Sequence, residues 1–444
     1  MPKLVAEFTY PCRLWRKTSR ARKQNRMTYD STFSAYGKRL RDFIRRSSAN
    51  ISPGDRMSAA EDEQQFNELA CDLFQLQFKN NAAYRRFCET RNISPGVVTN
   101  WKQAPAVPTA AFKVLELTSL APAERTTVFY SSGTTEHRPS RHFHNAESLA
   151  VYEASLWPWF AKHLFADAKK VGQASRLTEP KEAGSKARTG ETPVLLCILT
   201  PPLAHGPHSS LIHMFETVRR QCGSDESAYT GAIRDGAWAI NFDQTVLRLQ
   251  QAVSANHPIA ILGTAFNFVH LLDRLSERNL CYRLPEGSRV LETGGYKGRS
   301  RSLQKEQFHG LVTEFLGIPN THIICEYGMS ELSSQAYDRR VQSTAFRRSS
   351  SESASVHTTD NTQHAPRRFH FPAWARVQII SPETGREVNE DETGLIRVCD
   401  LANVRSVMAV QTEDLAVRCG GGFELIGRAA PGEPRGCSLM TAQV

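Results

Sequence analysis

Short apolar runs that alternate with helix-like segments constrain the fold of this chain more than any other feature. The four runs occupy residues 194–199, 259–264, 290–295 and 322–325. Amphipathic segments at 266–275 and about 301–316 separate the last three runs. Short apolar runs bounded by Gly, Pro or polar residues are typical of buried strands. Strands that alternate with helices predict an α/β architecture, in which ligands bind at the carboxyl ends of the strands.

The remaining segments differ in composition. Residues 28–120 repeat apolar residues at helical spacing, and an aromatic-rich amphipathic helix is expected at 147–165. Two polar tracts, at about 166–192 and 339–368, contain hardly any large apolar residues and are interpreted as surface insertions. Strand-like runs from residue 371 onward predict that the C-terminal part is rich in β-structure.

The net charge of +10 is concentrated at the N-terminus. Residues 1–26 carry eight Lys or Arg and one acidic residue, a balance of +7 that leaves +3 for the other 418 residues. Basic tails of this kind are usually disordered and solvated. We therefore expect a disordered tail at 1–26, one domain over 27–440, and no nucleic-acid partner.

The cysteines and the hydropathy indicate a cellular location. The ten cysteines are dispersed, with no Cys-x-x-Cys pair, which is typical of a protein in a reducing compartment. No apolar run approaches the roughly 18 to 20 residues that a membrane span needs. The N-terminus lacks the apolar segment of a secretory signal. These features predict a cytoplasmic protein without a membrane span.

A turn rich in hydroxyl groups follows the apolar residues 128–130. Its residues are Ser131, Ser132, Gly133, Thr134 and Thr135. The glycine permits a tight turn with exposed N–H groups, and the four hydroxyls offer further donors to phosphate oxygens. An ordinary Ser/Thr-rich turn has the same composition, so the turn becomes informative only in combination with other segments.

A carboxylate follows the run at 322–325. Glu331 comes just after Tyr327 and Gly328, and a carboxylate that faces a phosphate-binding loop suggests Mg²⁺ held between protein and nucleotide. A solvated surface carboxylate would give the same local sequence. The strand at 290–293 likewise runs into Gly294 and Gly295, where the backbone can approach a flat ring closely.

These segments, in this order, resemble the signatures of adenylate-forming enzymes, which couple a carboxylic acid to AMP. The resemblance implies that the hydroxyl-rich turn binds ATP phosphates and that Gly294 and Gly295 line the adenine. It also implies that the Tyr327 ring stacks on that base. Glu136 and the absence of a lysine after Pro139 depart from the phosphate-loop pattern, and an arginine, Arg138 or Arg141, is expected to supply the positive charge.

Two further segments extend this resemblance. Residues 412–414 (Thr-Glu-Asp) and the pair Gly427-Arg428 resemble the motifs that close the nucleotide domain. Asp414 would accept both ribose hydroxyls, because a carboxylate accepts more than one hydrogen bond. Arg428 would neutralise phosphate or fix the hinge. His208 is a weaker candidate for the carboxylate site, since most isolated histidines are structural or lie on the surface.

Longer stretches resemble the LuxE-type acyl-protein synthetases within this superfamily. They are residues 291–301 (Leu-Glu-Thr-Gly-Gly-Tyr-Lys-Gly-Arg-Ser-Arg), 326–337 (Glu-Tyr-Gly-Met-Ser-Glu-Leu-Ser-Ser-Gln-Ala-Tyr) and 435–439 (Arg-Gly-Cys-Ser-Leu). The resemblance implies that a fatty acid reacts with ATP, in the presence of Mg²⁺, to give acyl-AMP. A protein thiol then takes the acyl group as a thioester. Cys437 occupies the position of the cysteine that relatives use, and an acyl reductase is the acceptor protein that the family implies.

The expected fold is therefore the large N-terminal domain of adenylate-forming enzymes, with layered sheets, flanking helices and a small β-rich part. Only 16 residues follow Arg428 and none is lysine, so we expect the C-terminal lysine-bearing domain to be reduced or absent. Two alternatives stay open. One is an acyl- or aryl-CoA ligase resembling phenylacetate-CoA ligases, and the other is an adenylate-fold binding module that has lost catalysis.

Overall fold

The computed structural model describes residues 32–48, 59–131, 138–165, 195–295, 300–340 and 367–429. The predictions for the basic tail, for the first polar tract and for most of the second concern residues outside these ranges. The described residues belong to one compact unit that starts at Ser31. No helix within the described ranges is long and apolar enough to cross a membrane.

Most of the described strands form one mixed sheet. Its order is β12-β13-β14-β15-β11-β10-β9-β8-β7-β4, and β1 pairs with β14 at the side. The parallel part consists of β4 (Leu195–Ile198), β7 (Ile259–Thr264), β8 (Arg289–Thr293) and β9 (Ile323–Tyr327). These are the four strands that the apolar runs predict, so the α/β assignment is confirmed.

The other part of the sheet is antiparallel. It contains β10 (Ala336–Arg340), β11 (Arg367–His370), β12 (Ala375–Ile380), β13 (Thr393–Asp400), β14 (Ala409–Cys419) and β15 (Gly422–Arg428), with β1 (Val107–Pro108) parallel to β14. Two hairpins stand apart, one of β2 (Thr127–Tyr130) with β3 (Arg141–His144) and one of β5 (Gly231–Arg234) with β6 (Ala237–Ile240). The β-rich C-terminal part is therefore confirmed.

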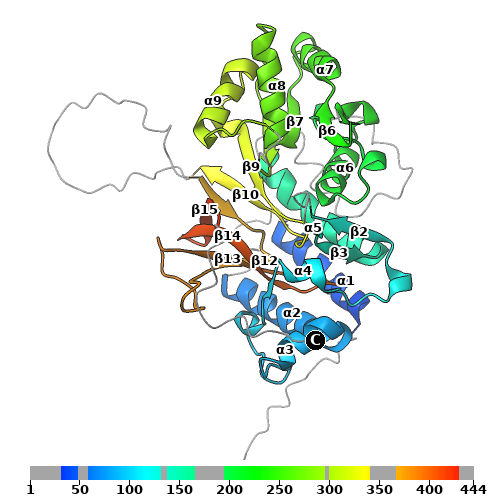
Figure 1. Cartoon of the computed structure of the whole chain (residues 1–444), viewed down its shortest axis with the longest axis vertical. Helices are drawn as coiled ribbons and strands as arrows, with labels where there is room; N and C mark the ends of the chain where they lie inside the picture. Colours follow the sequence, from blue (N-terminus) through cyan, green and yellow to red (C-terminus); the bar gives the residue numbers. More distant parts are fainter. Residues whose placement is uncertain are drawn as a thin grey trace, which may run out of the picture. The chain divides into compact units, whose positions relative to one another are not determined.

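Helices flank both parts of the sheet (Figure 1). The N-terminal helices are α1 (Phe33–Ser48), α2 (Ala59–Asn80), α3 (Ala82–Glu89) and the short α4 (Ala111–Val114). The later helices are α5 (Ala146–Leu164), α6 (Ser210–Cys222), α7 (Phe242–Ser254), α8 (Ala265–Glu277) and α9 (Lys305–Leu316). The helix expected from about 301 begins only at Lys305, behind the N-cap Gln304.

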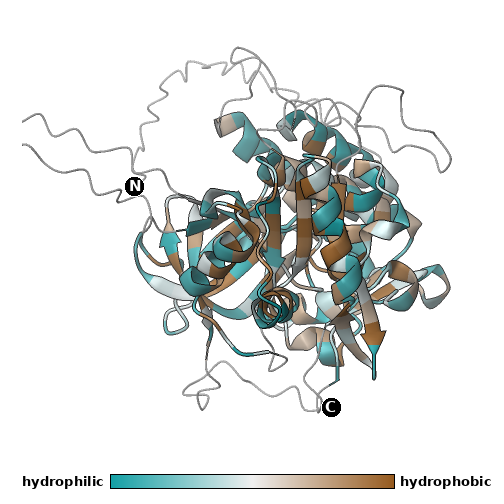
Figure 2. Ribbon diagram, turned by 90° about the horizontal axis from the view of Figure 1, so that it is seen from above, coloured by the Kyte–Doolittle hydropathy of each residue, from teal (hydrophilic) through white to brown (hydrophobic). Residues whose placement is uncertain are grey.

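The alternation of side chains along each parallel strand explains why helices cover both faces. On β7, Ala260 and Leu262 pack with residues of α5 and α6, whereas Ile259 and Ile261 pack with residues of α7, α8 and α9. Successive side chains of a strand point to opposite faces, so a strand that is apolar throughout needs cover on both sides. Figure 2 shows mainly hydrophobic strands flanked by helices that carry both hydrophilic and hydrophobic residues. In the antiparallel part, a third core joins α1, α2 and α3 to β12, β13 and β14.

A buried carboxylate joins the two parts of the sheet. Asp400, at the end of β13, accepts hydrogen bonds from the backbone N–H groups of Ser333 and Ser334, both at 2.8 Å. Its other oxygen accepts from the Ser334 hydroxyl at 2.7 Å and from the Ala402 N–H at 2.9 Å. Four donors satisfy the carboxylate, and the segment that follows β9 is thereby held against the antiparallel strands.

We expect Asp400→Ala to lower the free energy of unfolding by about 3 kcal/mol, because the change leaves several buried donors without an acceptor. Urea titration followed by circular dichroism measures this loss. The matched control is Asp243→Ala, which removes a carboxylate that is 85% exposed and should cost less than about 1 kcal/mol. Equal losses for the two variants would contradict a structural role for the Asp400 network.

Candidate active site

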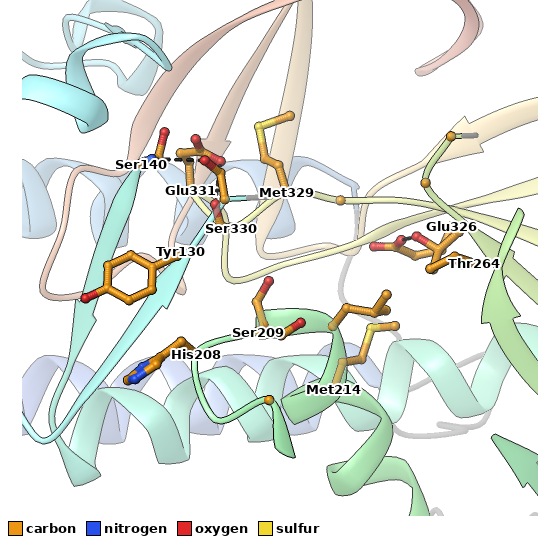
Figure 3. A pocket seen from close by; sticks show the side chains of 18 of the residues that line it. Tyr130, Ser140, His208, Ser209, Met214, Thr264, Glu326, Met329, Ser330 and Glu331 are labelled. Carbon is orange, nitrogen blue, oxygen red and sulfur yellow. Dashed lines mark hydrogen bonds between the residues drawn. The ribbon is translucent and has the colours of Figure 1, made fainter. Parts of the chain in front are cut away.

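A cavity of about 880 Å³ lies at the carboxyl ends of the parallel strands β7, β8 and β9. Thr264, Thr293 and Glu326 stand at the ends of these strands and line it, as shown in part by Figure 3. Further parts of the wall come from the start of α6, from the residues beside β2 and β3, from β14 and β15, and from α4, α5, α8 and the β5–β6 hairpin. This is the location that an α/β sheet predicts for a ligand.

The cavity brings together most of the described candidate residues, although they come from distant parts of the sequence. Those that line it are Ser131, His208, Gly294, Gly295, Gly328, Glu331, Asp414 and Arg428. Ser132, Gly133, Thr134, Thr135 and Cys437 lie outside the described residues. The individual roles that the sequence suggests for all of these residues stay predictions.

Ser131 is anchored at the start of the hydroxyl-rich turn. Its backbone N–H donates to the Ser140 carbonyl at 3.2 Å, and its hydroxyl accepts from the Ser140 N–H at 2.9 Å. Arg138 and Ser140 line the cavity beside it. The two ends of the turn are thus tied together at the cavity wall, and the Arg138 guanidinium adds a positive charge to that wall.

Glu331 is 5% exposed and lines the cavity, and its backbone is fixed from two sides. The Asn403 amide donates to the Glu331 carbonyl at 2.9 Å. His142 Nδ1 donates to the neighbouring Ser330 carbonyl at 2.8 Å, and burial lowers the pKa of His142 to about 4, which keeps the imidazole neutral. The Ser330 hydroxyl donates to Glu331 Oε2 at 3.0 Å, so Oε1 stays available for a ligand.

The surroundings of Glu331 suit a hard cation that is completed by other oxygen ligands. Within the described ranges there is no group of three or more His, Cys, Asp or Glu side chains that could hold a metal ion. Mg²⁺ is commonly bound by one or two carboxylates together with water and substrate phosphates. The buried carboxylate of Glu331 at the wall of the cavity fits that pattern of ligands.

Tyr327 differs from the expectation. Its ring is 7% exposed and packs on Phe369, Phe371 and Phe423, and it is not among the residues that line the cavity. The Tyr327 hydroxyl instead donates to Asp414 Oδ2 at 2.8 Å. The structure therefore places the Tyr327 ring in an aromatic cluster with Phe369, Phe371 and Phe423, with its hydroxyl group on Asp414.

Asp414 points one carboxylate oxygen at Tyr327 and lines the cavity with the rest of its side chain. Burial raises the pKa of Asp414, while the hydrogen bond from Tyr327 and the nearby Arg428 charge oppose that rise. Arg428 is the cross-strand neighbour of Asp414, but its guanidinium pairs with Glu413 at 3.1 Å, where both side chains are exposed. Arg428 thus lies at the rim of the cavity.

His208 is exposed at the cavity wall and links α6 to the β2–β3 hairpin. Its Nδ1 lies 3.1 Å from the Val128 carbonyl, which implies that Nδ1 carries the proton. The His208 carbonyl accepts from the Tyr130 N–H at 2.9 Å, and the two rings lie 5.1 Å apart. These contacts hold the His208 ring at the cavity wall through Nδ1 and the backbone.

Two residues that sequence reasoning missed also line the cavity. Lys113, on the short α4, is half-buried and brings a positive charge to the same wall as Ser131 and Arg138. No local signal marks it, since it lies in an ordinary apolar segment before the hydroxyl-rich turn. It offers the cationic group that the turn itself lacks.

The second missed residue is Glu326, at the end of β9. Thr293 Oγ1 donates to Glu326 Oε2, and burial raises the pKa of Glu326 to about 7. A Cβ atom at position 328 would lie 2.1 Å from Glu326 Oε1, so Gly328 leaves the space that this carboxyl occupies. The sequence signal for Glu326 was its position next to Tyr327 and Gly328. The burial of the Glu326 side chain could not be predicted from the sequence.

We expect the pH dependence of stability to reveal the buried Glu326. Its pKa is about 7 in the folded protein against the ordinary 4.5, so the folded state holds this proton more tightly than the unfolded chain. The contribution of this proton to the free energy of unfolding is fully present below the pKa of Glu326 in the unfolded chain, and it is lost as the pH rises through 7. Glu326→Gln has no such proton, so its stability relative to the wild type should grow by about 3 kcal/mol between pH 4.5 and pH 8.

Urea unfolding of both proteins at a series of pH values measures that difference, and titration of the buried histidines cancels between them. Glu424→Gln, a change at an exposed position of β15, is the control and should show a constant difference from the wild type. A constant difference for Glu326→Gln as well would show that the pKa of Glu326 is the same in the folded and unfolded states.

The fold of the described residues is similar to that of solved CoA ligase structures. The structure resembles 2-hydroxyisobutyryl-CoA ligase in an open conformation in complex with 2-HIB-AMP and CoA, with a TM-score of 0.54 and 13% sequence identity over 86% of this chain and 80% of that one. The same ligase in the postadenylation state gives a TM-score of 0.54 with 72% of its chain covered. The expected mixed α/β architecture with a large sheet and flanking helices is thus confirmed.

The resemblance to the acyl-protein synthetases is confirmed as well, because residues 225–343 match the family described as "Acyl-protein synthetase, LuxE". The chain is 22% identical to a long-chain-fatty-acid–luciferin-component ligase of Aliivibrio fischeri over 217 residues, which are 46% of this chain and half of that protein. It is 20% identical to the protein of the same name from Vibrio harveyi over 402 residues, covering 87% of this chain and 89% of that protein.

Proposed function

We propose that the protein is a ligase that activates a long-chain fatty acid with ATP and transfers the acyl group to a protein cysteine as a thioester. The observation that carries the proposal is the shared cavity of Ser131, Glu331 and Asp414, at the strand ends where ligands of this fold bind. The names of the two relatives from A. fischeri and V. harveyi support the fatty acid as substrate. The proposed cellular location of the protein is the cytoplasm.

In the first step, an oxygen of the fatty acid carboxylate attacks the α-phosphorus of ATP. The new P–O bond gives acyl-AMP, and pyrophosphate leaves. Mg²⁺ bound to the phosphates would neutralise charge as pyrophosphate departs. Glu331 would hold the metal, Asp414 would accept hydrogen bonds from the ribose, and Lys113, Arg138 and Arg428 would attract the phosphates.

In the second step, the thiolate of Cys437 attacks the acyl carbon of acyl-AMP. A C–S bond forms, the bond between the acyl carbon and the phosphate oxygen breaks, AMP leaves, and the thiol proton passes to solvent. A thiolate is an effective nucleophile toward an activated acyl group. By family analogy, an acyl reductase is the protein that would receive the acyl group from this cysteine.

Pyrophosphate release tests the proposal directly. The purified protein is incubated with ATP, Mg²⁺ and fatty acids of several chain lengths, and reactions without fatty acid or with excess chelator are the controls. Release that depends on fatty acid and Mg²⁺ is the expected result. If no chain length causes release, the protein is a binding module with this fold. If added CoA receives the acyl group and Cys437 is dispensable, the protein is an acyl-CoA ligase.

A further inference from the structure

The polar groups at one end of the cavity indicate which carboxylic acid the protein uses as substrate. This inference rests on the proposed function. Figure 3 shows Glu326 and Thr264 at one side of the cavity, with Met214 next to them, and Tyr130, Ser140 and Glu331 at the other side. With the ATP phosphates between Ser131 and Glu331, we place the acyl group at the end of the cavity formed by Glu326 and Thr264. The side chain of Glu326 then lies against the substrate acyl group.

Glu326 has unused capacity for hydrogen bonds. Only one of its oxygens accepts from a described side chain, the Thr293 hydroxyl. The other oxygen, Oε1, lies over Gly328, which itself lines the cavity. Tyr337 stands directly opposite Glu326 across β9 and β10, is fully buried, and has a hydroxyl without a hydrogen-bond partner among the described residues. Glu326 therefore brings an oxygen with unused hydrogen-bonding capacity to the cavity, and a plain acyl chain has no donor to offer it.

The chemistry of a carboxyl group indicates what this end of the cavity binds. A methylene chain laid against Glu326 would shield Oε1 from water without replacing the lost hydrogen bond. A hydroxyl both donates and accepts, so it pairs with a carboxyl group in its ionised and in its neutral form. We propose that the acyl substrate carries a hydroxyl group and that Glu326 determines this specificity by hydrogen bonding to it.

The experiment measures binding, so it does not depend on turnover. The probes are sulfamoyl-adenosine mimics of acyl-AMP, made from tetradecanoic acid and from its 2-hydroxy, 3-hydroxy and 14-hydroxy forms. We expect the wild type to bind one hydroxylated mimic at least about tenfold more tightly than the plain one in isothermal titration calorimetry. Glu326→Gln should keep this preference, because an amide still pairs with a hydroxyl, and Glu326→Leu should lose it.

Equal or weaker binding of every hydroxylated mimic by the wild type would overturn the inference, and this result needs no variant to fold. A preference that survives in Glu326→Leu would also overturn it, with thermal unfolding as the check that the variant is folded. A hydroxyl preference in binding without any pyrophosphate release would support the inference and reject the proposed activity. Release of pyrophosphate together with equal binding of the plain and hydroxylated mimics would support the proposed activity and reject the hydroxyl specificity.

Discussion

Cys437→Ala is expected to abolish covalent acylation of the protein while pyrophosphate release continues. The variant removes the thiol that would attack acyl-AMP and leaves the described residues of the cavity unchanged. With ATP, Mg²⁺ and a radiolabelled long-chain fatty acid, wild-type protein should carry a label on a denaturing gel that hydroxylamine removes. The label should fall to background in the variant, because no other group would form the thioester.

The matched control is Cys281→Ala, since Cys281 is the exposed free cysteine among the described residues. It should keep both the label and pyrophosphate release. A label that persists in Cys437→Ala and disappears in Cys281→Ala would assign the acylated thiol to Cys281. Pyrophosphate release without a protein label in the wild type would instead indicate a soluble acceptor such as CoA.

Glu331→Gln is expected to lower the rate of pyrophosphate release by about 10²- to 10³-fold. The amide has nearly the shape of the carboxylate but lacks the charge that would hold Mg²⁺ against the phosphates. The backbone contacts from Asn403 and toward His142 do not involve the substituted group, so the segment should stay in place. Initial rates at several Mg²⁺ concentrations measure the loss, which should be smallest at high Mg²⁺.

Glu424→Gln, at an exposed position of β15, is the control for a change in charge and should keep the wild-type rate. An unchanged rate and an unchanged Mg²⁺ requirement in Glu331→Gln would contradict the metal role of Glu331. Loss of the folded signal of Glu331→Gln in circular dichroism would show that the lower rate has a structural cause. Asp400→Ala disturbs the same segment after β9, so comparison of its rate with that of Glu331→Gln would separate loss of structure from loss of metal binding.

Much of the fold was accessible from the sequence because the parallel strands are apolar on both faces. The runs that contain β7 and β8 stand out for that reason, and each continues into residues that line the cavity. Most antiparallel strands pair with the next strand in sequence, but β11 lies between β10 and β15, and that part of the order could not be foreseen. Pairing of β11 with both β10 and β15 is a consequence of tertiary packing.

Local sequence determined the types of residue around the cavity, and the tertiary structure decided their positions. Glu331 was predicted from its position after an aromatic-glycine turn, whereas Asp414 was predicted from the resemblance of residues 412–414 and 427–428 to motifs of adenylate-forming enzymes. The place of Tyr327, with its hydroxyl group on Asp414, was decided by the aromatic cluster of Phe369 and Phe423, which only sheet pairing assembles.

The same distinction applies to the two residues that were missed. Lys113 reaches the cavity because α4 follows β1, which pairs with β14 some three hundred residues away in sequence. The pKa of Glu326 is raised because the fold removes water from the end of β9. The sequence by itself determined the chemical groups, whereas burial and long-range strand pairing decided which groups meet and how strongly each binds its proton.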